Sequence, residues 1–155
     1  MAAQAKPGVQ ERILLHLLDY SDFKDSIEVP FALSQMGIAN AVAIARSNVP
    51  RAIAGLKDQS ILVERQAHVK GVSRKRKAYF LTDSGITLAS ETWDRLSDWP
   101  VRIVLDDQPA VSTTLGGAKG VLPFEMRPVD IIRYIDEHNC FCLLYTSDAA
   151  DEVVG

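Results

Sequence analysis

The sequence has 155 residues, of which 47% are hydrophobic and 24% are charged. This composition fits one soluble domain with a buried core, or one domain with a small appendage. No apolar run reaches the roughly eighteen residues of a membrane span, and the first eight residues lack the apolar segment of a secretory signal. Two cysteines exclude a disulfide scaffold. We therefore expect a cytoplasmic protein without a membrane partner.

The net charge of −3 conceals a strong asymmetry along the chain. Residues 45–80 contain nine basic and two acidic residues, a net charge of +7, whereas the rest of the chain carries −10. A basic segment in an acidic protein is typical of a surface that binds a polyanion. The alternative is a charged face that serves only solubility.

The first part of the chain predicts a helix that follows a disordered N-terminus. Residues 1–8 are small and polar, and we expect them to be disordered. Apolar residues then recur at helical spacing over 8–20. Residues 28–33 contain a proline, so they can form at most a short edge strand.

Two further helices are predicted in close succession. Ser34 is a suitable N-cap for a helix over 35–42, and another helix follows over 46–58. Pro50 has no N–H, so it has to lie in the first turn of this third helix, which we expect to be slightly disturbed. The inner side of the third helix is formed by Val49, Ile53 and Leu56.

A β-hairpin with a basic tip and a fourth helix come next. Residues 61–69 and 77–81 have strand-like composition, and the hydrophilic residues 70–76 separate them as a loop. Thr82 can cap a helix over 83–97. One side of this helix is apolar, either as core or as a dimer interface, and carries Ile86, Ala89, Trp93 and Leu96.

The pattern changes near residue 98, where a small appendage is predicted over 98–141. Pro128 suits the first position of a helix. The glycine-rich segment of the appendage lacks the residues of a phosphate-binding P-loop. The predicted elements are strands over 101–105 and 111–115, a flexible segment over 116–120 and a helix over 128–138.

Two segments carry a resemblance to a known family. Residues 37–53 read Gly-Ile-Ala-Asn-Ala-Val-Ala-Ile-Ala-Arg-Ser-Asn-Val-Pro-Arg-Ala-Ile, and residues 76–85 read Arg-Lys-Ala-Tyr-Phe-Leu-Thr-Asp-Ser-Gly. In this order and spacing they resemble the helix-turn-helix run and the wing strand of winged helix-turn-helix transcription regulators, especially MarR-like and archaeal ones. The resemblance implies a mainly α fold with a small β-hairpin wing (α+β) over 9–97, followed by the short α/β appendage.

The resemblance implies a sequence-specific regulator that binds double-stranded DNA and can form a homodimer, with an unknown small-molecule effector. The recognition helix over 46–58 would enter the major groove, and the wing over 70–77 would lie on the backbone or in the minor groove. Ser47, Asn48 and Arg51 would face base edges, because Asn and Arg can bind adenine and guanine with two hydrogen bonds. The other expected contacts are Arg46, Lys57, Lys70, Arg74, Lys75, Arg76 and Lys77.

These contacts have structural alternatives. Arg51 could contact a phosphate or pair with Asp58, and Ser47 and Asn48 could cap the helix. The cations of the wing could serve solubility. The residues themselves leave these alternatives open.

Two positions depart from the family pattern. Ala43 stands where the family has a turn glycine, so this corner must avoid a left-handed backbone or accept strain. Pro50 replaces a common serine or threonine and removes a hydroxyl that could contact a phosphate.

The last residues resemble foreign sequence. Residues 142–152, Cys-Leu-Leu-Tyr-Thr-Ser-Asp-Ala-Ala-Asp-Glu, resemble a translated sequencing adapter, so we interpret 142–155 as an artefactual tail. The appendage over 98–141 would then be a dimerisation element or the start of a truncated effector domain.

No catalytic arrangement is recognisable, so we expect no enzyme activity. The three histidines are scattered, and Cys140 and Cys142 lack the second pair or the histidine spacing of a zinc site, so we expect no metal and no cofactor. One alternative function is a regulatory or protein-interaction winged-helix module of a larger signalling protein or ATPase. Another is an RNA-binding winged helix.

Overall fold

The computed structural model describes residues 6–106, 108–136 and 138–143. The described residues form two compact units, one over residues 7–94 and the other made of Lys6 and the described residues from Arg95 onward. Among the described residues, no helix combines the length and the apolar character that crossing a membrane requires.

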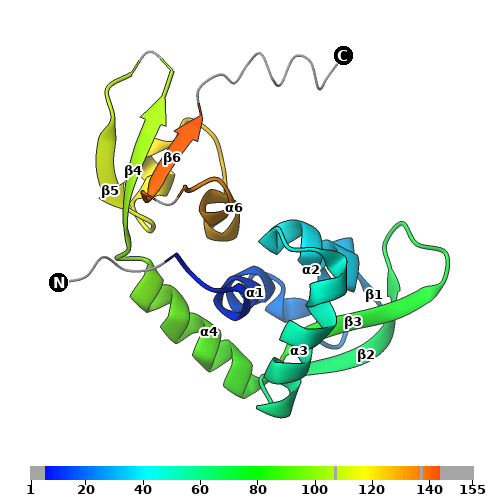
Figure 1. Cartoon of the computed structure of the whole chain (residues 1–155). Helices are drawn as coiled ribbons and strands as arrows, with labels where there is room; N and C mark the ends of the chain where they lie inside the picture. Colours follow the sequence, from blue (N-terminus) through cyan, green and yellow to red (C-terminus); the bar gives the residue numbers. More distant parts are fainter. Residues whose placement is uncertain (1–5, 107, 137, 144–155) are drawn as a thin grey trace. The chain divides into compact units, whose positions relative to one another are not determined.

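Three helices form the centre of the first unit: α1 (Val9–Leu18), α2 (Gln35–Val42) and α3 (Val49–Asp58). Helix α1 contacts both α2 and α3, which contact each other (Figure 1). The apolar stripes predicted for these helices are confirmed as buried, because each stripe faces the other two helices. The shared core includes Ile13, Leu14, Leu17, Ile38, Val42, Ile53 and Leu56.

The start of α2 is fixed by the predicted cap. The Ser34 hydroxyl accepts a hydrogen bond from the backbone N–H of Gly37 at 3.1 Å and donates one to the carbonyl of Phe31 at 2.7 Å. Gly37 is required here, because a Cβ at this position would collide with the backbone of Phe31 and Ala32. The cap and this close approach hold α2 against the turn that precedes it.

Of the two outcomes that the sequence allows at the corner after α2, the structure shows the strained one, a left-handed backbone at Ala43. Ala43 has φ 58° and ψ 51°, a left-handed conformation that costs an alanine roughly 1 kcal/mol. The guanidinium of Arg12 in α1 donates a hydrogen bond to the carbonyl of Val42 at 2.7 Å. Burial at this position lowers the pKa of Arg12. A cation at the carbonyl end of α2 stabilises the corner.

The predicted third helix is divided. A 3-10 turn over Arg46–Asn48 comes first, and α3 begins at Val49. Pro50 lies at the start of α3, where its missing N–H would have no helical partner. The disturbed first turn predicted from Pro50 is therefore confirmed, although the regular helix begins three residues later than predicted.

The sheet of the first unit has the strand order β1-β2-β3. Strand β1 (Glu28–Val29) pairs in parallel with β2 (Leu62–Val69), which pairs antiparallel with β3 (Lys75–Leu81). Figure 1 shows the β2–β3 hairpin extending away from the three helices.

The predicted start of the second hairpin strand, residue 77, was wrong. Lys75 pairs with His68 and Arg76 with Ala67, so the strand takes in two residues that we had placed in the loop. The loop is shorter than predicted, because the hydrogen-bonded ladder continues through residues whose charged side chains remain in water.

Helix α4 (Asp83–Leu96) begins at the predicted cap. The Thr82 hydroxyl accepts a hydrogen bond from the N–H of Gly85 at 2.9 Å. Gly85 lies against the carbonyl of Ile61, where a Cβ would collide. This close approach explains why a glycine follows the cap by three residues, at the end of the segment 76–85.

The second unit has a three-stranded sheet in the order β5-β4-β6. The predicted hairpin is present, since β4 pairs antiparallel with β5. The parallel strand beside β4, β6, was not predicted. The elements of this unit are β4 (Pro100–Leu105), β5 (Val111–Thr114), α5 (Ala118–Val121), α6 (Pro128–Arg133) and β6 (Cys140–Leu143).

Two local predictions in this unit were wrong. The helix predicted over 128–138 ends at Arg133, because the Asp136 carboxylate accepts hydrogen bonds from the N–H groups of His138 and Cys140 and forms a turn. The glycine-rich segment predicted to be flexible contains the helical turn α5.

The structure describes the N-terminus from Lys6 onward, so the predicted disorder over 1–8 does not include Lys6, whose ammonium donates a hydrogen bond to the carbonyl of Ile135 at 3.0 Å. Residues 1–5, and most of the interpreted tail (144–155), lie outside the described residues.

Candidate nucleic-acid interface

The three predicted base-contacting residues are exposed at the start of α3. Ser47 and Asn48 lie in the 3-10 turn and Arg51 in the first turns of the helix, while Val49, Ile53 and Leu56 are buried on the other side. Among the described residues, Arg51 makes no ion pair with Asp58, and neither Ser47 nor Asn48 caps α3 with its side chain. Neither the Arg51–Asp58 ion pair nor side-chain capping of α3 by Ser47 or Asn48 is therefore observed among the described residues, while a phosphate contact of Arg51 stays an alternative to base recognition.

The basic residues of the hairpin are also exposed. They lie partly in the loop and partly on β3, as described above. Within the described parts of the chain, no carboxylate pairs with Lys70, Arg74, Lys75 or Arg76. The exposed cations of the hairpin are Lys70, Arg74, Lys75, Arg76 and Lys77.

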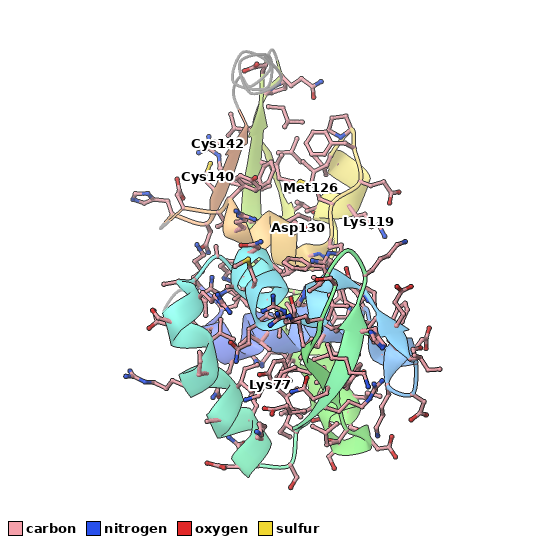
Figure 2. All side chains as sticks on the ribbon, turned by 90° about the vertical axis from the view of Figure 1, so that its right-hand side faces the viewer. Lys77, Lys119, Met126, Asp130, Cys140 and Cys142 are labelled. Atoms are coloured by element: carbon pink, nitrogen blue, oxygen red, sulfur yellow. The ribbon has the colours of Figure 1, made fainter. Side chains whose placement is uncertain are left out.

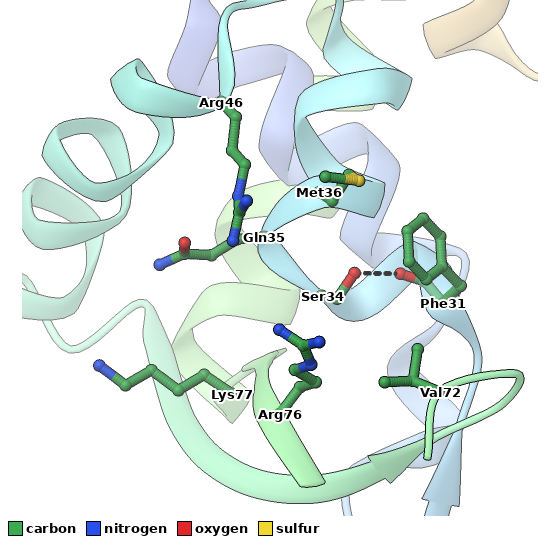
Figure 3. Close-up of a pocket in the computed structure, with 8 residues that line it drawn as sticks. All are labelled: Phe31, Ser34, Gln35, Met36, Arg46, Val72, Arg76 and Lys77. Carbon is green, nitrogen blue, oxygen red and sulfur yellow. Dashed lines mark hydrogen bonds between the residues drawn. The ribbon is translucent and has the colours of Figure 1, made fainter. Parts of the chain in front are cut away.

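A groove of about 450 Å³ joins the helix-turn-helix to the hairpin (Figure 3). Arg46 enters it from the 3-10 turn before α3, and Arg76 and Lys77 enter it from β3. The groove therefore places Arg46, from the turn before α3, on the same face of the unit as Arg76 and Lys77. Its lining residues are Phe31, Ser34, Gln35, Met36, Arg46, Val72, Arg76 and Lys77.

Lys57 differs from most of the other predicted contacts, because it forms a close ion pair with a carboxylate. Its ammonium lies 3.0 Å from Glu64, whose other carboxylate oxygen lies 3.7 Å from Lys77. The hydrogen bond between Lys57 and Glu64 lowers the pKa of Glu64 and raises the pKa of Lys57. Both residues are charged at neutral pH, so Glu64 partly neutralises Lys57 and, more weakly, Lys77.

Arg65 belongs to the basic segment but has a structural role. Its guanidinium donates hydrogen bonds to the carbonyls of Lys24 and Ser26, each at 2.7 Å, and to that of Phe23 at 3.3 Å. It also lies 4.5 Å from the centre of the Phe80 ring, a cation–π distance. Arg65 therefore attaches the loop after α1 to the hairpin, and its charge should not be counted toward an external surface.

Gln35 is a groove residue that is absent from the predicted contacts. It is the first residue of α2, and its side-chain amide donates a hydrogen bond to the Tyr79 hydroxyl at 2.9 Å. Tyr79 is buried, and this burial raises its pKa. No local pattern points to this pair, because 44 residues of sequence separate the two side chains.

The second unit contains a small group of potential metal ligands. Ligand atoms of Asp136, Cys140 and Cys142 all lie within 4.8 Å of one another, a grouping that was not predicted from the spacing of the cysteines. Figure 2 labels the two cysteines of this group. Burial raises the pKa of the Cys140 thiol to about 11, and the Asp136 carboxylate already accepts two backbone N–H groups. Cys142 is also the first residue of the adapter-like segment, so we assign this group no function.

Comparisons with known proteins give structural neighbours and no sequence relatives. No protein-family model matches the sequence. No curated protein matches it either.

Solved structures of three bacterial proteins are among those that resemble the chain. MepR, a transcription regulator of the Staphylococcus aureus multidrug efflux pump MepA, is 22% identical, with a TM-score of 0.44 over 57% of this chain and 56% of that chain. An apo mutant of Lactococcus lactis ZitR is 22% identical, with a TM-score of 0.42 over 56% and 55%. The adhesin competence repressor AdcR of Streptococcus pyogenes is 24% identical, with a TM-score of 0.42 over 57% and 56%. The chain thus spans a little over half the length of each neighbour.

The fold class predicted from the sequence is confirmed by the arrangement of the elements. Three helices, a two-stranded antiparallel hairpin and a fourth helix follow in the order of a winged helix-turn-helix. A small α/β unit follows, as the sequence predicts.

Proposed function

We propose that the first unit binds double-stranded DNA in a sequence-specific manner and that the chain is a transcription regulator. One observation supports this proposal: the 3-10 turn that precedes α3 and the basic hairpin border the same groove, which Arg46, Arg76 and Lys77 line. An exposed helix of this size fits the major groove of B-DNA, and a basic hairpin beside it can follow the phosphate backbone.

The proposed contacts divide into two kinds. Ser47, Asn48 and Arg51 face the bases, because they are polar, exposed and opposite the buried stripe of α3. The cations of the hairpin bind phosphates and release condensed counterions, which supplies affinity without sequence preference. Lys57 contributes less than the sequence suggests, because Glu64 holds its ammonium.

The remaining parts of the proposal concern setting and assembly. We propose a cytoplasmic, non-enzymatic regulator that binds as a homodimer, with two recognition helices about one turn of DNA apart. The alternative is a regulatory or protein-interaction module of a longer signalling protein or ATPase. The exposed cations favour DNA, because a protein-docking winged helix needs an apolar or acidic recognition face.

Selection from a pool of random DNA duplexes tests the proposal. The chain should enrich one sequence motif, and fluorescence anisotropy should show tighter binding to that motif than to a scrambled duplex or to duplex RNA. Lys119→Ala is the matched control, because it removes an exposed cation from α5 in the second unit. Absence of any enriched motif, or equal binding to DNA and RNA, would contradict the proposal.

A further inference from the structure

Tyr79 is a buried residue of β3 whose hydroxyl reaches a different part of the first unit. Its side chain is 1% exposed, and in the hairpin its position pairs with that of Glu64 on β2. The hydroxyl accepts a hydrogen bond at 2.9 Å from the side-chain amide of Gln35. One side chain therefore connects the wing strand to the first residue of α2.

The hydroxyl has a role that the aromatic ring alone does not explain. A phenylalanine would fill the same apolar volume, but it would leave the Gln35 amide without this partner. Because burial raises its pKa, Tyr79 stays a neutral phenol at physiological pH and can both accept and donate a hydrogen bond.

The orientation of the Gln35 amide decides which polar atoms this side chain presents to the groove. Its side chain lines the groove together with Arg46 and Lys77, and Figure 3 shows the Arg46 side chain extending toward it. A glutamine amide has two N–H donors and one acceptor oxygen, so the bond to Tyr79 leaves one donor and the oxygen available. The free donor can bind a phosphate oxygen that the neighbouring cations attract.

We infer that Tyr79 is a positioning residue of the DNA interface, and that it acts through Gln35. This inference rests on the proposed function. Tyr79 holds the Gln35 amide in one orientation before DNA arrives, so that binding does not have to immobilise a flexible side chain. The hydroxyl itself, buried in the sheet, does not touch the DNA.

A double-mutant cycle tests this inference. Tyr79→Phe and Gln35→Ala should each weaken binding to the selected duplex about fivefold, the size expected for one hydrogen bond. The double variant should be no weaker than the weaker single variant, because both changes remove the same interaction. Tyr134→Phe in the second unit, a half-exposed tyrosine, should leave the affinity unchanged.

Thermal unfolding of each variant separates positioning from folding. If Tyr79→Phe does not fold, Gln35→Met keeps the side-chain length without the amide and should show the same fivefold loss. Wild-type affinity of folded Gln35→Met, or single losses that multiply in the double variant, would overturn the inference while leaving the proposed function intact. A wild-type chain that binds no duplex would instead overturn the proposed function and this inference with it.

Discussion

The cations of the basic segment in the first unit fall into two groups. We call those with protein partners, Arg65 and Lys57, the inner edge, and the exposed cations without a carboxylate partner, such as Arg51 and Lys75, the outer edge. On the inner edge, Arg65 binds three backbone carbonyls and Lys57 pairs with Glu64. On the outer edge, Arg51 and Lys75 are exposed and have no carboxylate partner among the described residues. Net charge along the sequence therefore overstates the charge that a polyanion would meet.

The chemistry of the side chains explains the difference. The planar guanidinium of Arg65 has five donors, so it suits several carbonyls that converge from one loop. The outer cations lie in a part of the sequence with only two acidic residues, Asp58 and Glu64, so they have few possible partners. Their mutual repulsion is tolerated because water screens it, and DNA phosphates would relieve it.

The largest expected effect concerns the inner edge. Arg65→Met should lower the free energy of unfolding by roughly 3 kcal/mol, because it removes charged hydrogen bonds to three carbonyls. Denaturant unfolding measures this loss, and Lys75→Met on the outer edge should change stability by less than about 0.5 kcal/mol. Equal stability of the two variants would contradict the structural role that we assign to Arg65.

The next largest effect concerns base recognition on the outer edge. Arg51→Ala should weaken binding to the selected duplex by about 1–3 kcal/mol and relax the preference at one base pair. Anisotropy titrations against single-base variants of the site measure both. A loss that is the same for every sequence would show that Arg51 contacts a phosphate instead.

Lys75→Ala should have a smaller and uniform effect. Removal of one phosphate contact should reduce the salt slope by about one and leave the preferred sequence unchanged. The measurement is the affinity for the selected and scrambled duplexes at several salt concentrations. A changed preferred sequence would argue against a backbone role for the wing.

The smallest expected effect concerns Glu64, which pairs with Lys57 and, at a longer distance, with Lys77. Glu64→Gln removes the charge that holds Lys57 and Lys77, so affinity for scrambled duplex should rise roughly twofold at low salt. In the wild type, the folded pKa of Glu64 is lowered, so the ion pair is complete above the ordinary carboxyl pKa. The ion pair is lost only as the pH falls through the lowered pKa that Glu64 has in the folded protein. Unchanged affinity of the variant at pH 7 would show that Glu64 does not restrain the two lysines.

Local patterns in the sequence predicted much of the first unit. The helical stripes, the caps at Ser34 and Thr82 and the disturbed turn before Pro50 all follow from spacings of a few residues. The start of β3 and the strand β6 were not predicted, because both depend on pairing with a distant strand.

The same reason explains which features of the candidate site were not predicted. The Arg65 contacts and the bond between Gln35 and Tyr79 connect residues about forty positions apart in the sequence. The exposed cations were easier to predict, because a charged side chain without a partner needs only water around it.

The salt dependence of DNA affinity tests the central claim most directly. If the outer cations neutralise about five phosphates, the logarithm of the affinity should fall with the logarithm of the salt concentration, with a slope of roughly −4 to −5. Lys119→Ala should reproduce this slope, because its cation lies outside the first unit. An affinity that does not change with salt would show that the exposed cations of α3 and the hairpin do not meet a phosphate backbone.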